Sequence, residues 1–294
     1  MGHHHRVTAF LFSVGLLPFL LTATGCQLSA GSLLERQTER TFHARAGSVV
    51  KVELAGGAVT IQTGPPGVVQ VVLHQAVDAG SEREADALLA DYEVSATQSG
   101  DQIQAIGRRR RGAVSRLWQH NAVRINATIT APDDIRLDLT TSGGSIDVRG
   151  ERVALVQAHT SGGSIHIDGG ADSRLSTSGG SIKVGRASRT LQADTSGGSI
   201  TVDYVGAAAS DVNLGTSGGG IRVGVDPDAA LQIDAATSGG RVRVEQLALG
   251  HVSRSTTSES STPDRSHVRG VLNNGTGRLY AKTSGGSIVI RSAR

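Results

Sequence analysis

The chain has 294 residues, of which 39 are glycine, and only 3% of its residues are aromatic. So few aromatic residues cannot form a stacking platform for bases, and a formal net charge of +3 is no general nucleic-acid signature, so we expect no nucleic-acid partner. A single cysteine excludes an intramolecular disulfide, a four-cysteine zinc site and an iron–sulfur cluster, and we expect no metal and no cofactor.

Residues 1–25 are typical of an export signal. Three histidines and Arg6 form a polar, basic start, and residues 7–24 (VTAFLFSVGLLPFLLTAT) are apolar or small and carry no charge. Such a segment could span a bilayer, but the small residues at its end favour a cleaved signal peptide. The histidines fit this start, or a cloning remnant, better than a metal site.

The only cysteine, Cys26, follows directly in the sequence LLTATGC, which resembles a bacterial lipobox. The alternative is an ordinary secretory signal with an incidental cysteine. Lipidation of Cys26 with two or three acyl chains would give a stable anchor. We therefore expect an exported lipoprotein whose partner is the membrane, at the outer membrane or cell surface.

Residues 26–45 are polar and are expected to be a tether, followed by a β-rich region over 46–130. VVKVEL and GAVTIQT suggest a hairpin, and VVQVVLHQAV suggests a further strand. Residues 81–92 (SEREADALLADY) are the one expected helix, because Ser81 and Glu84 form a capping-box pattern.

Four consecutive arginines, Arg108, Arg109, Arg110 and Arg111, stand in this region, with Arg116 and Trp118 nearby. Such a run could bind a phosphate-bearing glycolipid or a membrane surface, so these four residues are possible anion-binding residues. The alternative is a solvated loop, which we favour because arginine supplies nearly all the cations of this chain.

Residues 131–294 hold a repeat. TSGGSI starts at 141, 160, 177, 195 and 283, with the variants TSGGGI at 216 and TSGGRV at 237. The first six copies start 17–21 residues apart, and the 46 residues before the last copy suggest one degenerate repeat in between. Within this gap, the Ser/Thr-rich residues 251–270 are expected to be an inserted surface loop.

Apolar residues alternate with polar ones on both sides of each motif, which reads as strand, tight turn, strand. The paired glycines are expected to supply the positive φ of a sharp turn. Because one repeat cannot bury its own apolar residues, the sequence predicts an all-β fold in which stacked repeats form a β-solenoid-like array. A flattened β-sandwich and a β-prism are the alternatives.

The outward positions show no acidic, aromatic or histidine ladder of the kind that a repeated binding site would need. His159, His166 and Asp168 fall within one repeat, but most such residues are ordinary surface residues. Residues 215–219 match G-x-S-x-G only because one repeat has glycine before TSGG, and they follow a strand rather than a strand-to-helix elbow. We therefore expect no catalytic residues and no enzyme.

The TSGGSI motifs followed by x-V resemble the bacterial DUF4097 family, whose members often carry the label of candidate adhesin. The resemblance covers residues 131–294, and more weakly 46–61, where VELAGGAVTI has the same form. It implies a β-stranded repeat domain in an exported, envelope-associated protein, and it implies no catalytic site.

Three functional hypotheses remain open. The first is a non-catalytic, lipid-anchored cell-envelope protein whose repeat domain is a scaffold or adhesion surface for an envelope glycan, lipid or protein. The second is an envelope-stress sensor that binds an anionic lipid or glycan through Arg108 to Arg111. The third is a carbohydrate-active enzyme on a β-helix, which would need clustered carboxylates such as Asp147, Asp168, Asp194 and Asp203.

Overall fold

The computed structural model describes residues 32–110, 123–150, 153–256 and 266–293, all within one compact unit. These residues form 21 strands and one helix, so the all-β class with a single short helix is confirmed. The signal segment and Cys26 lie outside the described residues. No helix among the described residues is long and apolar enough to cross a membrane.

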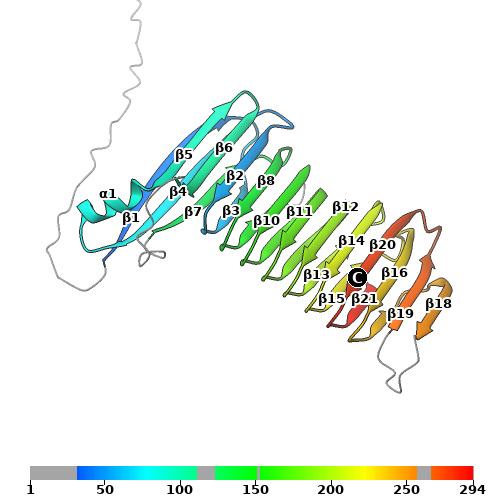
Figure 1. Ribbon diagram of the computed structural model, residues 1–294. Coiled ribbons are helices and arrows are strands. Elements are labelled where there is room, and N and C mark those ends of the chain that lie inside the picture. The colour runs from blue at the N-terminus through cyan, green and yellow to red at the C-terminus, as the bar shows by residue number, and fades with distance from the viewer. Residues whose placement is uncertain (1–31, 111–122, 151–152, 257–265, 294) are drawn as a thin grey trace, which may run out of the picture. The chain divides into compact units, whose positions relative to one another are not determined.

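The strands form two layers that continue into each other (Figure 1). In spatial order, layer 1 contains β5 (Tyr92–Ser99), β6 (Gln102–Arg109), β2 (Val49–Leu54), β8 (Arg136–Thr141), β10 (Leu155–Thr160), the ends of β11 (Ile165–Thr177) and β12 (Ile182–Thr195), β14 (Asp211–Thr216), β20 (Gly277–Thr283), β16 (Leu231–Thr237), β19 (Ser266–Leu272) and β18 (Gly250–Thr256). Layer 2 contains β1 (Ser32–His43), β4 (Val68–Ala79), β7 (Val123–Ala131), β3 (Val59–Thr63), β9 (Ile146–Val148), the starts of β11 and β12, β13 (Ile200–Val205), β15 (Ile221–Val225), β21 (Ile288–Ser292) and β17 (Val242–Glu245).

Each repeat is one coil of a flattened solenoid, made of a layer 1 strand, the Ser-Gly-Gly turn and a layer 2 strand. The two strands of a coil do not pair with each other. Instead, each pairs in parallel and in register with the same strand of the next coil, as Thr160 does with both Thr141 and Thr177. The expected hairpins, including the one over β2 and β3, are therefore wrong, and the turns are arches between layers.

The motif threonines form a buried ladder along the turns. In seven coils the threonine hydroxyl donates a hydrogen bond of 2.7–2.8 Å to the carbonyl oxygen of the second glycine in the neighbouring coil. In most of these coils the threonine hydroxyl oxygen also accepts a hydrogen bond from the N–H of the second glycine in its own motif, as Thr160 does from Gly163. The motif is thus a structural device that satisfies polar groups that would otherwise be buried without partners.

The second glycine is required by close packing rather than by a positive φ. A Cβ at Gly144, or at the second glycine of each of the six other motif copies, would lie 1.9–2.3 Å from a carbonyl oxygen of the adjacent coil. Among the described glycines, those with positive φ are Gly47, Gly67, Gly100, Gly150 and Gly275, and none belongs to the motif. The expectation of left-handed turn glycines is therefore wrong.

The core lies between the layers and consists of small aliphatic side chains. The predicted inward columns are buried, as Leu139 and Val148 show with no exposed surface. Ser173 takes the place of an apolar residue in the column four residues before the motif threonine. It is buried as well, with 7% of its surface exposed. Because every coil adds the same few Val, Ile, Leu and Ala side chains, the array needs almost no aromatic residues.

The order of coils differs from the order of repeats at the C-terminal end. The last coil, β20 and β21, lies between the coil of β14 and β15 and the coil of β16 and β17. The degenerate repeat expected before it is absent from the described residues, which instead form β18 and β19. These two strands form an antiparallel pair beside β16, so the described parts of the loop expected over 251–270 are strands.

The N-terminal end is closed in a similar way. β6 and β7 flank the first coil, and the antiparallel strands β4 and β1 extend layer 2 beyond β7. The tether expected over 26–45 is therefore wrong for residues 32–43, which are an edge strand whose polar side chains face solvent. Helix α1 (Glu82–Leu89) follows β4, and the Ser81 side chain accepts the N–H of Glu84, as the capping pattern predicted.

Candidate functional site

The outward side chains of layer 1 form two parallel rows, with one residue from each coil. We define the first row as the third residue before the motif threonine and the second row as the residue directly before it. In spatial order, the first row contains Asp138, Gln157, Arg174, Gln192, Asn213, Tyr280 and Asp234, and the second contains Thr140, His159, Ser176, Asp194, Gly215, Lys282 and Ala236. Parallel, in-register pairing is what brings these residues together.

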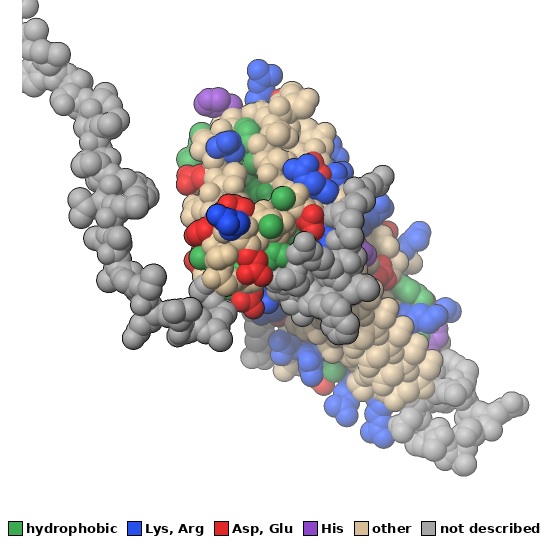
Figure 2. All heavy atoms as spheres, turned by 60° about the vertical axis from the view of Figure 1, so that its left-hand side comes forward, with side chains coloured by type: hydrophobic (Ala, Val, Ile, Leu, Met, Phe, Trp, Pro, Cys, Tyr) green, Lys and Arg blue, Asp and Glu red, His purple; other side chains and the backbone are tan. Residues whose placement is uncertain are grey.

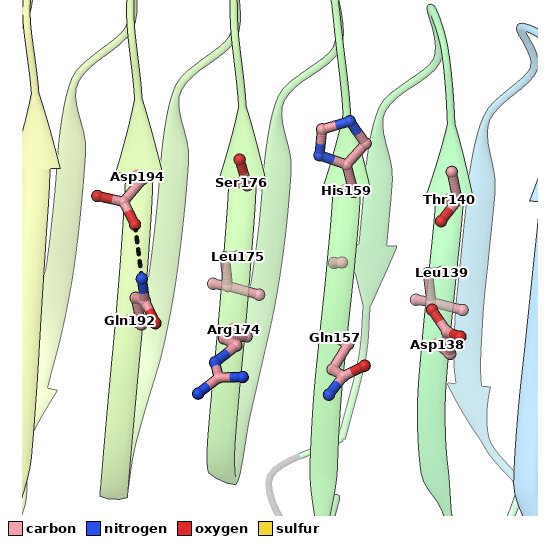
Figure 3. A pocket seen from close by; sticks show the side chains of 11 residues that line it. Asp138, Leu139, Thr140, Gln157, His159, Arg174, Leu175, Ser176, Gln192 and Asp194 are labelled. Atoms are coloured by element: carbon pink, nitrogen blue, oxygen red, sulfur yellow. Dashed lines mark hydrogen bonds between the residues drawn. The ribbon is translucent and has the colours of Figure 1, made fainter.

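A groove of about 390 Å³ lies where these rows cross β8, β10, β11 and β12. Figure 3 shows the side chains of both rows on the same side of layer 1, with Gln157, Arg174 and Gln192 side by side. Each of the four strands contributes an exposed side chain, namely Thr140, Gln157, Arg174 and Gln192. The groove is therefore open, and eight of its eleven lining residues have polar side chains.

Few polar groups of the groove are used within the chain. Gln192 donates to Asp194 over 3.2 Å, and the Asp194 carboxylate leans toward Gly215, where a Cβ would lie 2.6 Å from it. Within the described part of the chain, the side chains of Gln157 and Arg174 form no hydrogen bond or ion pair. Their donors and acceptors are available to a ligand in solution.

Several outward side chains of layer 2 pair with each other. Asp147 contacts Arg149 at 3.0 Å and His166 at 3.5 Å, and His166 lies 3.7 Å from Asp168. Lys183 and Asp203 lie 3.5 Å apart. Figure 2, in which the N-terminal end of the described strands comes forward, shows acidic and basic side chains interspersed there.

The residues considered for catalysis are brought together only in part. His166 lies between Asp147 and Asp168 on layer 2, whereas His159 and Asp194 are on layer 1. Within the described ranges, no three His, Cys, Asp or Glu residues are placed to hold a metal ion. The G-x-S-x-G sequence lies at a coil turn, where the Thr216 hydroxyl donates to the carbonyl oxygen of Gly198.

The arginine run lies at the end of β6, and its described members contact groups of the chain itself. Arg108 lies between Glu53 at 2.8 Å and Glu93 at 3.1 Å, and Arg109 lies 3.6 Å from Asp91. Arg110 donates to the backbone oxygen of Tyr92. Arg111, Arg116 and Trp118 lie outside the described residues.

A second depression of about 380 Å³ lies further along layer 1. It includes Tyr280, which belongs to the first row and is 38% exposed, together with Gln232 and Arg278. Beside it, Asp234 contacts His267 at 2.6 Å and Arg269 at 3.0 Å. This site could not be predicted from the sequence, because β20 reaches β16 only through the changed order of coils.

Tyr204, near the end of β13, forms a polar pair with Asp226. Tyr204 and Arg291 both line a depression on layer 2. The Tyr204 hydroxyl donates to the Asp226 carboxylate, which raises the pKa of Tyr204 above its ordinary value. The same hydrogen bond, with the N–H of Asp228, lowers the pKa of Asp226. The Arg186 guanidinium lies over the Tyr204 ring, 4.5 Å from its centroid.

No family model and no curated protein matches the chain. Solved structures similar to it include a candidate adhesin from Bacteroides fragilis, 10% identical, covering 87% of this chain and 97% of that chain with a TM-score of 0.43. A candidate cell adhesion protein from Clostridium sporogenes is 9% identical, covering 88% and 100%, with a TM-score of 0.36. A candidate adhesin from Parabacteroides merdae is 7% identical, covering 87% and 96%, with a TM-score of 0.37. At these values the likeness carries no functional argument, and the DUF4097 resemblance stays a prediction.

Proposed function

We propose that the chain is a non-catalytic, lipid-anchored protein of the cell envelope whose layer 1 is an interaction surface. The observation that carries this proposal is the groove across four coils, because its exposed polar side chains are largely unused within the chain. A rigid scaffold that holds such groups in fixed rows binds a partner with little loss of conformational freedom. The adhesion or scaffold role follows from this surface.

The spacing of carboxylates supports a binding role over glycoside hydrolysis. Asp138 and Asp194 are the two carboxylates that line the groove, and they lie three coils apart. Three coil steps amount to roughly 14 Å, because neighbouring strands lie about 4.8 Å apart. Paired catalytic carboxylates of glycosidases are separated by about 5 to 10 Å, so these two are too distant to share one glycosidic bond.

The anchor is proposed from the sequence LLTATGC, in which Cys26 would carry the lipid. We expect the chain, expressed with its signal in a bacterium, to be found in the membrane fraction and to be released into the soluble fraction by Cys26→Ser. An unchanged membrane fraction for Cys26→Ser would refute the anchor.

The interaction surface is tested by the binding of the full chain, purified in detergent, to isolated envelope fractions. Arg174→Glu reverses a charge in the middle of the groove, whereas Arg222→Glu makes the same change on an exposed residue of β15 in layer 2. We expect Arg174→Glu to reduce binding and Arg222→Glu to leave it unchanged. Equal binding by both variants would contradict a role for layer 1.

A further inference from the structure

We propose that the two rows of layer 1 bind an uncharged, hydroxyl-rich polysaccharide strand that lies across the coils. The inference rests on the proposed function, because it names the class of partner for the same surface. The binding site begins at the groove of β8 to β12 and extends along the first row to Tyr280.

The side chains of the groove match the chemistry of sugar hydroxyls. Each hydroxyl can both donate and accept a hydrogen bond, and the amides of Gln157 and Gln192 offer both kinds of group. Arg174 adds donors, and Asp194 adds acceptors beside Gln192. These groups are solvated and are held at fixed intervals by the strands, so a sugar can replace their water without rearranging the chain.

The charge of the groove does not suit an anionic ligand. Asp138 and Asp194 oppose the single cation Arg174, so the groove holds no cluster of positive charge. Phosphate and anionic lipid headgroups are held by clusters of Arg and Lys. The hydrophobic residues that complete the groove, Leu139, Ala158 and Leu175, are at most 4% exposed, so none of them offers an open apolar face to an acyl chain.

The spacing of the rows fits a polymer with a regular repeat. Successive coils present side chains at equivalent positions about 4.8 Å apart, which is close to the length of one sugar unit in an extended chain. Beyond Gln192, the first row continues through Asn213 to Tyr280, whose ring is exposed. A tyrosine ring offers an apolar face for the C–H groups of a sugar and a hydroxyl for hydrogen bonding.

The length of the row makes the proposal specific. From β8 to β20 there are five coil steps, or roughly 24 Å, so a trisaccharide that fills the groove from β8 to β12 cannot also reach Tyr280. An octasaccharide can contact both regions at once. The two contacts would then act within one complex, which increases the affinity for the longer ligand.

Binding of the sugars is measured by calorimetry with the full chain in detergent, and binding to vesicles by flotation of the Cys26→Ser chain without detergent. The probes are unsubstituted tri- and octasaccharides of glucose and of N-acetylglucosamine, a sulfated octasaccharide, and vesicles of phosphatidylglycerol. We expect at least one neutral octasaccharide to bind, to bind more tightly than its trisaccharide, and to compete with envelope fractions. The sulfated octasaccharide and the vesicles are expected to bind the unaltered chain no more tightly than they bind the double variant Gln157→Ala with Gln192→Ala.

The double variant Gln157→Ala with Gln192→Ala removes exposed amides and is expected to weaken octasaccharide binding roughly tenfold, which corresponds to about 1.4 kcal/mol. Tyr280→Ala should weaken the octasaccharide and not the trisaccharide. The control Arg222→Ala, an exposed residue of layer 2, should change neither. Circular dichroism establishes that each variant is folded.

The outcomes separate the two proposals. If the chain binds envelope fractions but no neutral oligosaccharide, or if the groove variant binds sugars like the unaltered chain, the polysaccharide site is refuted and the interaction surface stands. Competition by an envelope protein or by the vesicles alone also refutes it. If the chain binds neither the fractions nor the sugars, both proposals fail.

Discussion

The Thr141 hydroxyl donates a hydrogen bond of 2.8 Å to the carbonyl oxygen of Gly57, a residue 84 positions earlier in the chain. This bond joins the first coil, β2 and β3, to the coil of β8 and β9. Thr141 is 1% exposed, so neither its hydroxyl nor the Gly57 carbonyl oxygen can form a hydrogen bond to water instead if the other group is removed. The same contact recurs between the later coils and makes the turn edge of the solenoid a continuous polar ladder.

Thr141→Val tests the strength of this ladder, because it replaces the hydroxyl by a methyl group of similar size. The Gly57 oxygen would lose its side-chain donor, and we expect the free energy of unfolding to fall by about 1–3 kcal/mol. The neighbouring Thr140 is exposed, and Thr140→Val should change stability by no more than about 0.5 kcal/mol. Urea denaturation followed by circular dichroism measures both, and equal effects would contradict the ladder.

The two glycines of one motif are expected to respond differently to alanine. A Cβ at Gly163 would lie 2.0 Å from the carbonyl oxygen of Gly144, whereas at Gly162 the nearest atom would be 3.7 Å away. Gly163→Ala must therefore separate two coils, at a cost of about 3 kcal/mol or more. Gly162→Ala is expected to stay within about 0.5 kcal/mol of the unaltered chain. Thermal unfolding distinguishes this close-packing role from a general need for flexible glycines, for which both variants would suffer alike.

The Tyr204–Asp226 hydrogen bond predicts a change in stability at both ends of the pH range. The raised pKa of Tyr204 means that its contribution to stability is present below the unfolded value of about 10 and is lost as pH rises through the folded pKa. The lowered pKa of Asp226 means that its contribution is lost as pH falls below the unfolded value.

The raised pKa of Tyr204 is measured by the ultraviolet absorbance of its phenolate. Tyr204→Phe identifies the signal of Tyr204 among the three tyrosines. We expect Tyr204 to titrate above the ordinary tyrosine value, and Asp226→Asn to lower its pKa. A Tyr204 titration that is the same in both proteins would show that the carboxylate has no influence on the phenol.

The arginine run is expected to be structural rather than a binding site for anions. Arg108→Ser removes the contacts to Glu53 and Glu93, but Glu53 retains Lys51 at 2.7 Å. Because the Arg108 side chain is half exposed, the loss of stability should be no more than about 1 kcal/mol. In a Cys26→Ser background, which removes the proposed lipid, replacing Arg108 to Arg111 with serine should leave binding to phosphatidylglycerol vesicles unchanged in a flotation assay. A clear loss of binding would instead favour the envelope-sensor hypothesis.

Much of the fold could be predicted from the sequence, because local patterns determine it. The alternation around each motif identified the buried columns, and the pattern of Ser81 and Glu84 identified the only helix among the described residues. The role of Gly163 could not be predicted, because a glycine pair is equally compatible with a positive φ and with close packing. Only the distance between neighbouring coils decides between them.

The groove could be predicted only in part. The alternation predicts which residues form the two rows. It does not predict a binding surface there, because the rows hold chemically different polar groups, such as Gln157 and Arg174, and no ladder of identical side chains. The position of Tyr280 depends on the order of the coils. The strands of every coil offer the same backbone hydrogen-bonding groups, so the repeat pattern does not predict which coils are neighbours.

The order of the coils at the C-terminal end gives the last prediction. Arg222 of β15 pairs in register with Val289 of β21, and Val289 pairs on its other side with Arg243 of β17. Cysteines at 222 and 289 would have Cα atoms about 4.8 Å apart, within the range for a disulfide, whereas cysteines at 222 and 243 would be roughly 10 Å apart and beyond it. In a Cys26→Ser background, we therefore expect mild oxidation to cross-link Arg222→Cys with Val289→Cys, and not with Arg243→Cys, as read by the altered mobility of the unreduced chain in a denaturing gel. A solenoid whose coils follow the order of the repeats would place β15 beside β17 and reverse this result.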